Sequence, residues 1–125
     1  MPASRLKTIR LNLARTPEHP EGSDQHYYRF TAPLTDDGHL DPEGWKKQRD
    51  KCRVVRVWGG VEEDIGHLIH RPGGSWGFTY DIEGDEGDES GFRLGKHRFD
   101  LGEYVSIRDD DGKEQTFWVA SVLDA

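Results

Sequence analysis

Large apolar side chains alternate with small or polar ones between residues 76 and 82, and this period of two limits what the segment can form. The apolar positions are Trp76, Phe78, Tyr80 and Ile82, and the positions between them are Gly77, Thr79 and Asp81. Successive side chains of a strand point to opposite faces, whereas a helix would scatter these rings around its circumference. The alternation therefore predicts a strand with one apolar face and one polar face.

The same pattern recurs along most of the chain, with turn-forming residues between the segments. We expect strands at residues 5–14, 26–34, 52–58, 65–71, 75–82, 92–99, 103–108 and 115–122. A short helix is expected over residues 42–50, because Asp41 and Pro42 form a helix start signal and Trp45 supplies an anchor to the core. Residues 83–91 are glycine and acidic residues apart from Ser90, which predicts a solvated loop.

About eight short, evenly spaced strands with one helix predict an all-β domain. We expect a small antiparallel barrel or a strongly curved sheet, with a two-sheet β-sandwich as the alternative. Neither a repeat nor a linker divides the sequence, so residues 1–125 are expected to form a single barrel-like domain. A chain of this length buries roughly two-thirds of its surface on folding, which suffices for a core without disulfides.

The last hairpin has two candidate registers. A two-residue turn at residues 111–112 would pair Val105 with Trp118, whereas a three-residue loop would pair Val105 with Phe117 and Tyr104 with Trp118. We prefer the second register, because one face must be buried. It gathers these apolar residues on one face: Leu101, Val105, Ile107, Phe117, Val119 and Leu123.

Tyr104 and Trp118 would then pair on the opposite face of this hairpin. Two aromatic rings outside the main core call for a cover, and we expect the helix at 42–50 or the N-terminal segment to supply it. The hairpin is similar to those of many small bacterial β-barrels, and it does not single out a family.

Charge and composition exclude several classes of protein. The formal net charge of −7 makes the chain acidic and argues against nucleic-acid binding, which draws most of its affinity from neutralising phosphates. Cys52, the single cysteine, adjoins an apolar run and is expected to be a small buried hydrophobe. No apolar stretch reaches the length of a membrane-spanning helix, and residues 1–15 lack the apolar region of a secretory signal. We therefore expect a cytoplasmic protein that does not associate with membranes.

Up-and-down connections between neighbouring strands would place alternate loops at the same end of the domain. One end would collect residues 15–25, 59–64, 83–91 and 109–114, which carry most of the acidic side chains. The other end would collect residues 35–51, 72–75 and 99–102 and would be locally basic. The acidic loops are either solvated turns that keep the protein soluble or a site for a divalent cation or a basic partner.

Catalytic motifs are missing from the sequence. Ser75 lies in a glycine-rich segment but opens a strand, whereas a nucleophile elbow needs a strand-to-helix turn. His67 and His70 are three apart in a predicted strand, so they point to opposite faces and do not share a metal. We expect no catalytic activity and no cofactor. The remaining metal candidates are Asp85, Asp88, His67 and His97.

Aromatic and arginine residues beside the glycine-rich corners are better candidates for a binding surface, because Trp, Tyr and Arg dominate interface hot spots. The predicted ligand-binding residues are Trp58, His70, Arg71, Trp76 and Arg56. They suggest a non-catalytic binding or accessory module that recognises a protein partner or a small ligand. The alternative is a divalent-cation-binding protein or a small metal-assisted enzyme that uses the acidic loops and histidines.

Overall fold

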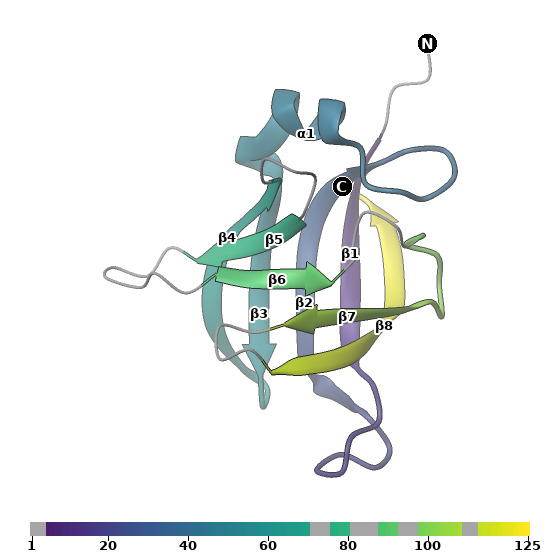
Figure 1. Cartoon of the computed structure of the whole chain (residues 1–125), viewed down its shortest axis with the longest axis vertical. Coiled ribbons are helices and arrows are strands. Elements are labelled where there is room, and N and C mark those ends of the chain that lie inside the picture. The colour runs from purple at the N-terminus through teal and green to yellow at the C-terminus, as the bar shows by residue number, and fades with distance from the viewer. Residues whose placement is uncertain (1–4, 71–75, 81–87, 93–97, 109–112) are drawn as a thin grey trace.

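Eight strands in chain order form the body of the molecule. The computed structural model describes residues 5–70, 76–80, 88–92, 98–108 and 113–125, with the backbone alone at residues 61–63, 80 and 88–92. The strands are β1 (Arg5–Leu13), β2 (Ser23–Leu34), β3 (Arg53–Trp58), β4 (Val61–His70), β5 (Trp76–Tyr80), β6 (Asp88–Phe92), β7 (Tyr104–Arg108) and β8 (Glu114–Asp124). Each strand pairs antiparallel with the next, and β8 returns to β1, which closes a barrel (Figure 1). The predicted all-β fold is confirmed.

The pairing of β1 with β8 closes the barrel. Leu13 lies opposite Phe117 and Leu11 opposite Val119, but Arg10 then lies opposite Ser121, so β8 has one extra residue at Ala120. Such a bulge increases the local twist and reverses the face on which the following side chains lie. Closure also removes the two free strand edges that an open sheet would present to other chains.

Aromatic side chains fill the barrel interior. The Phe78 ring stacks on Tyr28 with 5.4 Å between ring centroids and lies 5.3 Å from Phe30. Phe30 in turn meets the edge of Phe99 at 5.9 Å, and Tyr28 meets Phe117 at 5.0 Å. These inward positions continue the alternation read from the sequence. The buried set also includes Ile9, Leu11, Leu13, Ala32, Leu34, Val54, Leu68, Trp76, Val105, Ile107 and Val119.

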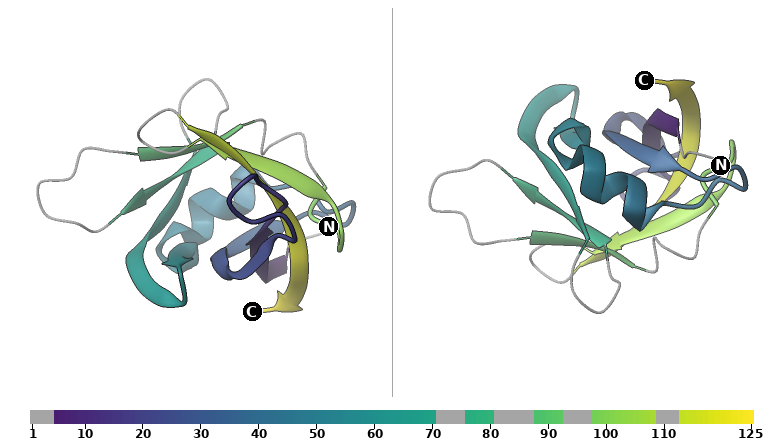
Figure 2. Two further views of the ribbon diagram at one scale, coloured as in Figure 1. Left: turned by 90° about the horizontal axis from the view of Figure 1, so that it is seen from below. Right: turned by 90° about the horizontal axis from the view of Figure 1, so that it is seen from above.

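The helix α1 (Pro42–Gln48) and the 3-10 turn η1 (Arg49–Lys51) lie across one end of the barrel (Figure 2). Asp41 caps the helix, since its Oδ1 accepts a hydrogen bond from the Glu43 amide at 3.1 Å. Trp45 is buried, and its indole Nε1–H donates to the Leu68 carbonyl at 2.8 Å. Its ring meets that of Trp76 at 6.1 Å. The predicted helix and its anchor are confirmed.

The last hairpin has the three-residue-loop register. Val105 lies opposite Phe117, and Tyr104 lies opposite Trp118, as predicted. Leu101 and Leu123 are exposed, so their assignment to the buried face was wrong. Leu101 precedes the start of β7, and Leu123 follows the bulge at Ala120, which turns it outward. The expectation that the helix at 42–50 covers Tyr104 and Trp118 is also wrong, because α1 lies across the end of the barrel instead.

The predicted position of the sixth strand is wrong. β6 occupies Asp88–Phe92, so all but its last residue lie in the segment 83–91 that was expected to be a loop, and residues 98–100 of the expected strand 92–99 are not part of a strand. The sequence of β6 has little intrinsic strand preference, but its backbone pairs with β5 on one side and β7 on the other. Phe99 still reaches the core, and its amide donates to the Gly38 carbonyl at 2.8 Å.

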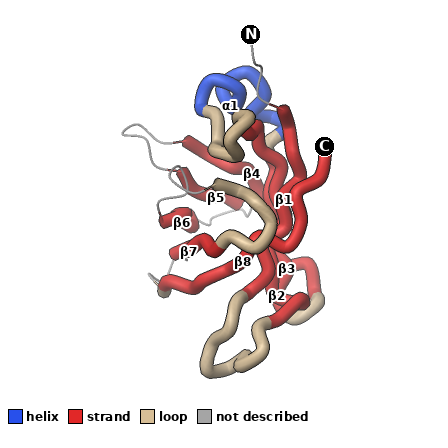
Figure 3. Tube along the Cα trace, turned by 90° about the vertical axis from the view of Figure 1, so that its right-hand side faces the viewer, coloured by secondary structure: helices blue, strands red, loops and turns tan. Residues whose placement is uncertain are grey.

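Among the described residues, alternate connections between strands lie at the same end of the barrel, as predicted. The loop between β1 and β2 and the turn between β3 and β4 lie at the end opposite α1 (Figure 3). The structure does not describe residues 71–75, 81–87, 93–97 and 109–112. The end of the barrel at which the charged side chains of those loops lie therefore stays a prediction.

The two-glycine turn between β3 and β4 gives a prediction about stability. Gly59 and Gly60 have φ of +71° and +81°, which only glycine adopts at little cost. A Cβ on Gly60 would also lie 3.1 Å from Gln25 Oε1. We expect Gly60→Ala to lower the free energy of unfolding in urea by about 1–2 kcal/mol. Gly59→Asn, where a Cβ meets nothing within 4 Å, should cost less, and equal costs would contradict this account.

Cys52 is buried as predicted, and its thiol donates to the Gln48 carbonyl at 3.4 Å. Burial, assisted by the charge of Asp50, raises the pKa of the Cys52 thiol to about 11. Only about one thiol in a thousand is then ionised at pH 8, and the thiolate is the reactive form. We expect iodoacetamide to alkylate the folded protein about a hundredfold more slowly than the urea-unfolded chain, as followed by mass spectrometry. Similar rates in the two states would show that Cys52 is accessible.

Candidate functional site

A row of outward-facing side chains crosses four adjacent strands on the outer face of the barrel. Tyr104 of β7 lies opposite Trp118 of β8, Trp118 opposite Asn12 of β1, and Asn12 opposite Tyr27 of β2. Tyr104 is 62% exposed and Trp118 is 37% exposed, whereas Asn12 is only 7% exposed. The row thus combines two accessible aromatic rings with a nearly buried amide, and we take it as the base of the candidate site.

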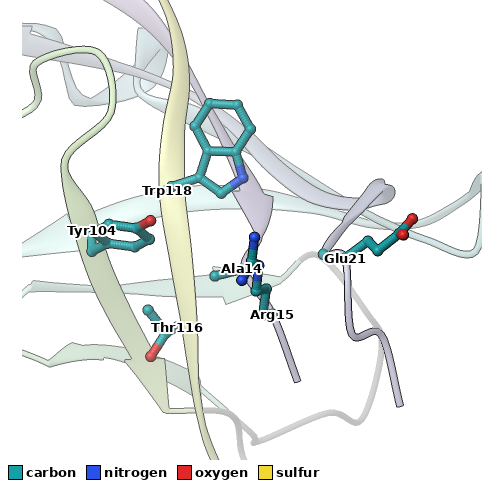
Figure 4. A pocket seen from close by; sticks show the side chains of 7 residues that line it. Ala14, Arg15, Glu21, Tyr104, Thr116 and Trp118 are labelled. Atoms are coloured by element: carbon teal, nitrogen blue, oxygen red, sulfur yellow. The ribbon is translucent and has the colours of Figure 1, made fainter. Parts of the chain in front are cut away.

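A first hollow of about 600 Å³ opens beside Trp118 (Figure 4). Ligand sites typically have volumes of about 300–1,000 Å³ and combine apolar surface with a few polar groups. Trp118 and Tyr104 supply the apolar ring surfaces here. Arg15 and Thr116 supply hydrogen-bond donors, and Glu21 supplies a carboxylate. The full lining is Ala14, Arg15, Glu21, Gly22, Tyr104, Thr116 and Trp118.

A second hollow of about 540 Å³ shares Glu21, Gly22 and Trp118 with the first hollow. Two carboxylates, Glu21 and Asp24, belong to its wall, and neither lysine nor arginine is among its described lining residues. Trp118 therefore lies between a hollow lined by both Arg15 and Glu21 and a hollow whose charged lining residues are the carboxylates Glu21 and Asp24, with two histidines beside them. The full lining is Asn12, His19, Glu21, Gly22, Ser23, Asp24, Gln25, His26 and Trp118.

The loop at residues 14–22 is held by its own backbone hydrogen bonds. The Ala14 amide donates to the Thr116 carbonyl at 2.9 Å, which ties the loop to β8. Thr16 and His19 exchange backbone hydrogen bonds of 3.0 Å in both directions. Gly22 has φ of +79°, and a Cβ there would lie 3.0 Å from the Leu13 carbonyl oxygen. A side chain at Gly22 would displace the loop that forms the wall of both hollows.

Arg10 fixes the wall of the second hollow from the outer face of β1. Its Nε donates to Asn12 Oδ1 at 2.8 Å, and its guanidinium donates to the Asp24 carbonyl at 2.7 Å. Its guanidinium carbon also lies 3.7 Å from the centroid of the Tyr27 ring. Through these contacts, Arg10 connects β1 to β2 and orients the side chain of Asn12.

A series of ring contacts, tilted and edge-on, leads from the second hollow toward the end of the barrel. Ser23 Oγ and His26 Nδ1 are 2.7 Å apart. The rings of His19 and His26 lie 4.5 Å apart, and the edge of His26 meets Trp58 at 4.6 Å. Among the predicted ligand-binding residues, Trp58 adjoins the second hollow, because it contacts His26 in the lining of that hollow.

The structure does not gather the predicted ligand-binding residues into one patch. The hairpin of β3 and β4 pairs Trp58 with Val61, so Trp58 lies at its turn, whereas His70 lies at the far end of β4. The His70 ring lies 4.4 Å from Trp76, which is 3% exposed and belongs to the core. Arg71 lies outside the described residues.

Arg56 belongs to the inner side of the barrel end rather than to the outer surface. It lies opposite Tyr28, whose side chain faces the interior. One guanidinium nitrogen is 3.8 Å from Asp64 Oδ2, and the guanidinium carbon is 4.3 Å from the centroid of the Trp58 ring. Arg56 and Trp58 thus form one interior contact that His70 and Trp76 do not share.

The metal candidates are only partly visible. Asp85 and His97 lie outside the described residues, and the side chain of Asp88 is not described. His67 is half-buried on β4 opposite Arg53 and Thr79. Among the described residues, no group of three or more His, Cys, Asp or Glu side chains is placed to hold a metal ion. The divalent-cation alternative stays a prediction.

The sequence contained a signal for the outer-face site. The preferred register of the last hairpin already set Tyr104 and Trp118 side by side outside the core, and the structure confirms that pair. No pattern in the sequence indicated that β1 would complete the site, because the pairing of Asn12 with Trp118 depends on closure of the barrel. The loop at 14–22 supplies the remaining wall, so the N-terminal part of the chain does adjoin the pair.

Comparisons with known protein families, with curated proteins and with solved structures found no match to this chain. A search of the described helices found none with the length and apolar character needed to cross a membrane.

Proposed function

We propose that this chain is a non-catalytic binding module that holds its ligand on the outer face of the barrel, across Trp118. The observation that carries this proposal is the position of Trp118, which is partly exposed between two hollows that share Glu21 and Gly22. Phe30, Phe78 and the other core rings occupy the interior at the middle of the barrel, which favours an outer site over an internal one.

The contacts around the second hollow favour binding over nucleophilic catalysis. Ser23 Oγ approaches an imidazole, but the two residues are three apart in the same strand. The same Oγ accepts a hydrogen bond from the Gln25 amide at 3.1 Å. Short-range contacts of this kind are typical of serine at the ends of elements and turns. We therefore assign Ser23 to holding the wall of the hollow in place.

A ligand-observed NMR screen tests this function. The wild-type protein would be screened against amino-acid derivatives, short peptides, monosaccharides and nucleotides by saturation-transfer difference. We expect at least one class of ligand to bind the wild type and to lose at least about tenfold in affinity with Trp118→Ala. An aromatic side chain that the ligand covers commonly contributes a large share of the binding free energy.

Ile65→Ala provides the matched control, because Ile65 is an exposed apolar side chain on β4, four strands away from β8 around the barrel. Its removal should leave binding unchanged. The proposal is wrong if no class binds, or if every ligand found binds Trp118→Ala as well as it binds the wild type.

A further inference from the structure

Guanidinium groups already lie over three aromatic rings of this chain. Arg10 lies 3.7 Å from the centroid of Tyr27, Arg56 lies 4.3 Å from that of Trp58, and Arg49 lies 5.3 Å from that of Trp45. Such cation–π contacts are favourable, most of all on tryptophan. Among the described residues, no cation lies over Trp118 or Tyr104, although these are the exposed aromatic rings of that set. Both residues line the first hollow, so a ligand there can bring a cation to their rings.

Opposite charges flank Trp118. Asp24 belongs to the second hollow, Arg15 belongs to the first, and Glu21 lines both. Arg15 and Glu21 are both exposed, and neither forms an ion pair with another described residue. Figure 4 shows the carboxylate of Glu21 pointing away from Arg15. A ligand that spans Trp118 would therefore meet carboxylates without a cation on the side of the second hollow, and Arg15 together with Glu21 on the side of the first.

We propose that the Trp118 site binds the C-terminal residue of a peptide that ends in arginine or lysine, an inference that rests on the proposed function. The basic side chain lies on the Trp118 ring with its charge toward Glu21 and Asp24. The terminal carboxylate lies toward Arg15, which donates paired hydrogen bonds to carboxylates readily. The formal net charge of −7 attracts a basic peptide from a distance.

The fixed walls of the hollows support this assignment. Arg10 is engaged by Asn12, Asp24 and Tyr27, so it does not compete for the ring of Trp118. Its bond to the Asp24 carbonyl holds that residue at the wall of the second hollow. A site that is already formed loses less conformational entropy when a flexible peptide end binds.

Three N-acetylated peptides test the proposal by calorimetric or NMR titration: Gly-Ser-Gly-Ser-Arg with a free carboxylate, the same peptide with a C-terminal amide, and the same acid with citrulline in place of arginine. Citrulline keeps the shape of arginine and removes its charge. We expect the first peptide to bind at least about fivefold more tightly than either of the others, since each loses one charged contact.

Two variants test which charged group of the peptide each hollow contacts. Arg15→Gln should abolish the preference for the free carboxylate while keeping the preference for arginine over citrulline. Glu21→Gln combined with Asp24→Asn should have the opposite effect. Both variants change exposed side chains, so they leave the core intact. The expected preference between each pair of peptides should fall from about fivefold to less than twofold.

The proposal is wrong if the citrulline peptide binds as tightly as the arginine peptide, or if Arg15→Gln still prefers the free carboxylate. It is also wrong if none of the three peptides binds. In that last case, a different ligand class that binds the wild type but not Trp118→Ala would leave the proposed binding function standing. Failure of every class would overturn both.

Discussion

Replacing Phe78 with alanine is expected to lower the free energy of unfolding by about 3–5 kcal/mol. The Phe78 ring is fully buried and contacts Tyr28 and Phe30, which link it to the rest of the aromatic core. Its removal would leave a cavity that strands held on both sides by hydrogen bonds do not collapse to fill. Because a domain of this kind is stable by only about 5–15 kcal/mol, the loss should be evident in urea denaturation.

Tyr104→Ala is the matched control for Phe78→Ala. Both changes remove an aromatic ring from a strand of the same barrel, but Tyr104 faces outward and is largely exposed. Its loss should cost less than about 1 kcal/mol, the value of a cross-strand pair. Equal costs for the two variants would mean that the inner and outer faces of the barrel have been assigned wrongly.

Trp45→Ala should have the next largest effect, also about 3–5 kcal/mol. This ring attaches α1 to the barrel end through its hydrogen bond to the Leu68 carbonyl and its edge contacts with Trp76 and His70. Alanine would remove the apolar surface and leave the Leu68 carbonyl without its indole donor. The helix has only seven residues, so it depends on this packing for its stability.

Trp45→Phe separates the two contributions at this position. Phenylalanine keeps most of the buried surface and loses the indole N–H, so about 1–2 kcal/mol should be lost. The measurement is urea unfolding followed by circular dichroism. A cost for Trp45→Ala below about 1 kcal/mol would contradict the role of Trp45 as the anchor of the helix.

The alternation of apolar residues predicted most of the inner face of the barrel correctly. Phe78, Val105 and Phe117 are buried as expected, because a register slip by one residue would turn every apolar side chain outward. The same rule failed where the strand is irregular. Leu123 follows the bulge at Ala120, and the sequence has no local signal for that extra residue.

Contacts between distant parts of the chain account for the other errors. β6 contains acidic residues and glycine, and it becomes a strand because β5 and β7 both pair with it. The predicted binding patch placed Trp58 and His70 together because both adjoin glycine-rich corners. The antiparallel pairing of β3 with β4 instead separates those corners by the length of the hairpin.

The outer-face site illustrates how closure creates a surface that no single hairpin contains. Trp118 and Tyr104 come from the last hairpin, and Asn12 and the loop at 14–22 come from the first part of the chain. Pairing of β1 with β8 brings the two parts together. Any change that opens the barrel at that seam should therefore remove the site along with the fold.

Fluorine NMR of protein labelled with 5-fluorotryptophan tests most directly whether the ligand site lies outside the packed barrel. The chain has four tryptophans, and single Trp→Phe variants would assign their resonances. On addition of the peptide that ends in arginine, we expect the Trp118 resonance to move while those of the buried Trp45 and Trp76 stay in place. Movement of Trp45 and Trp76 with Trp118 unchanged, or no movement of any resonance, would contradict the account.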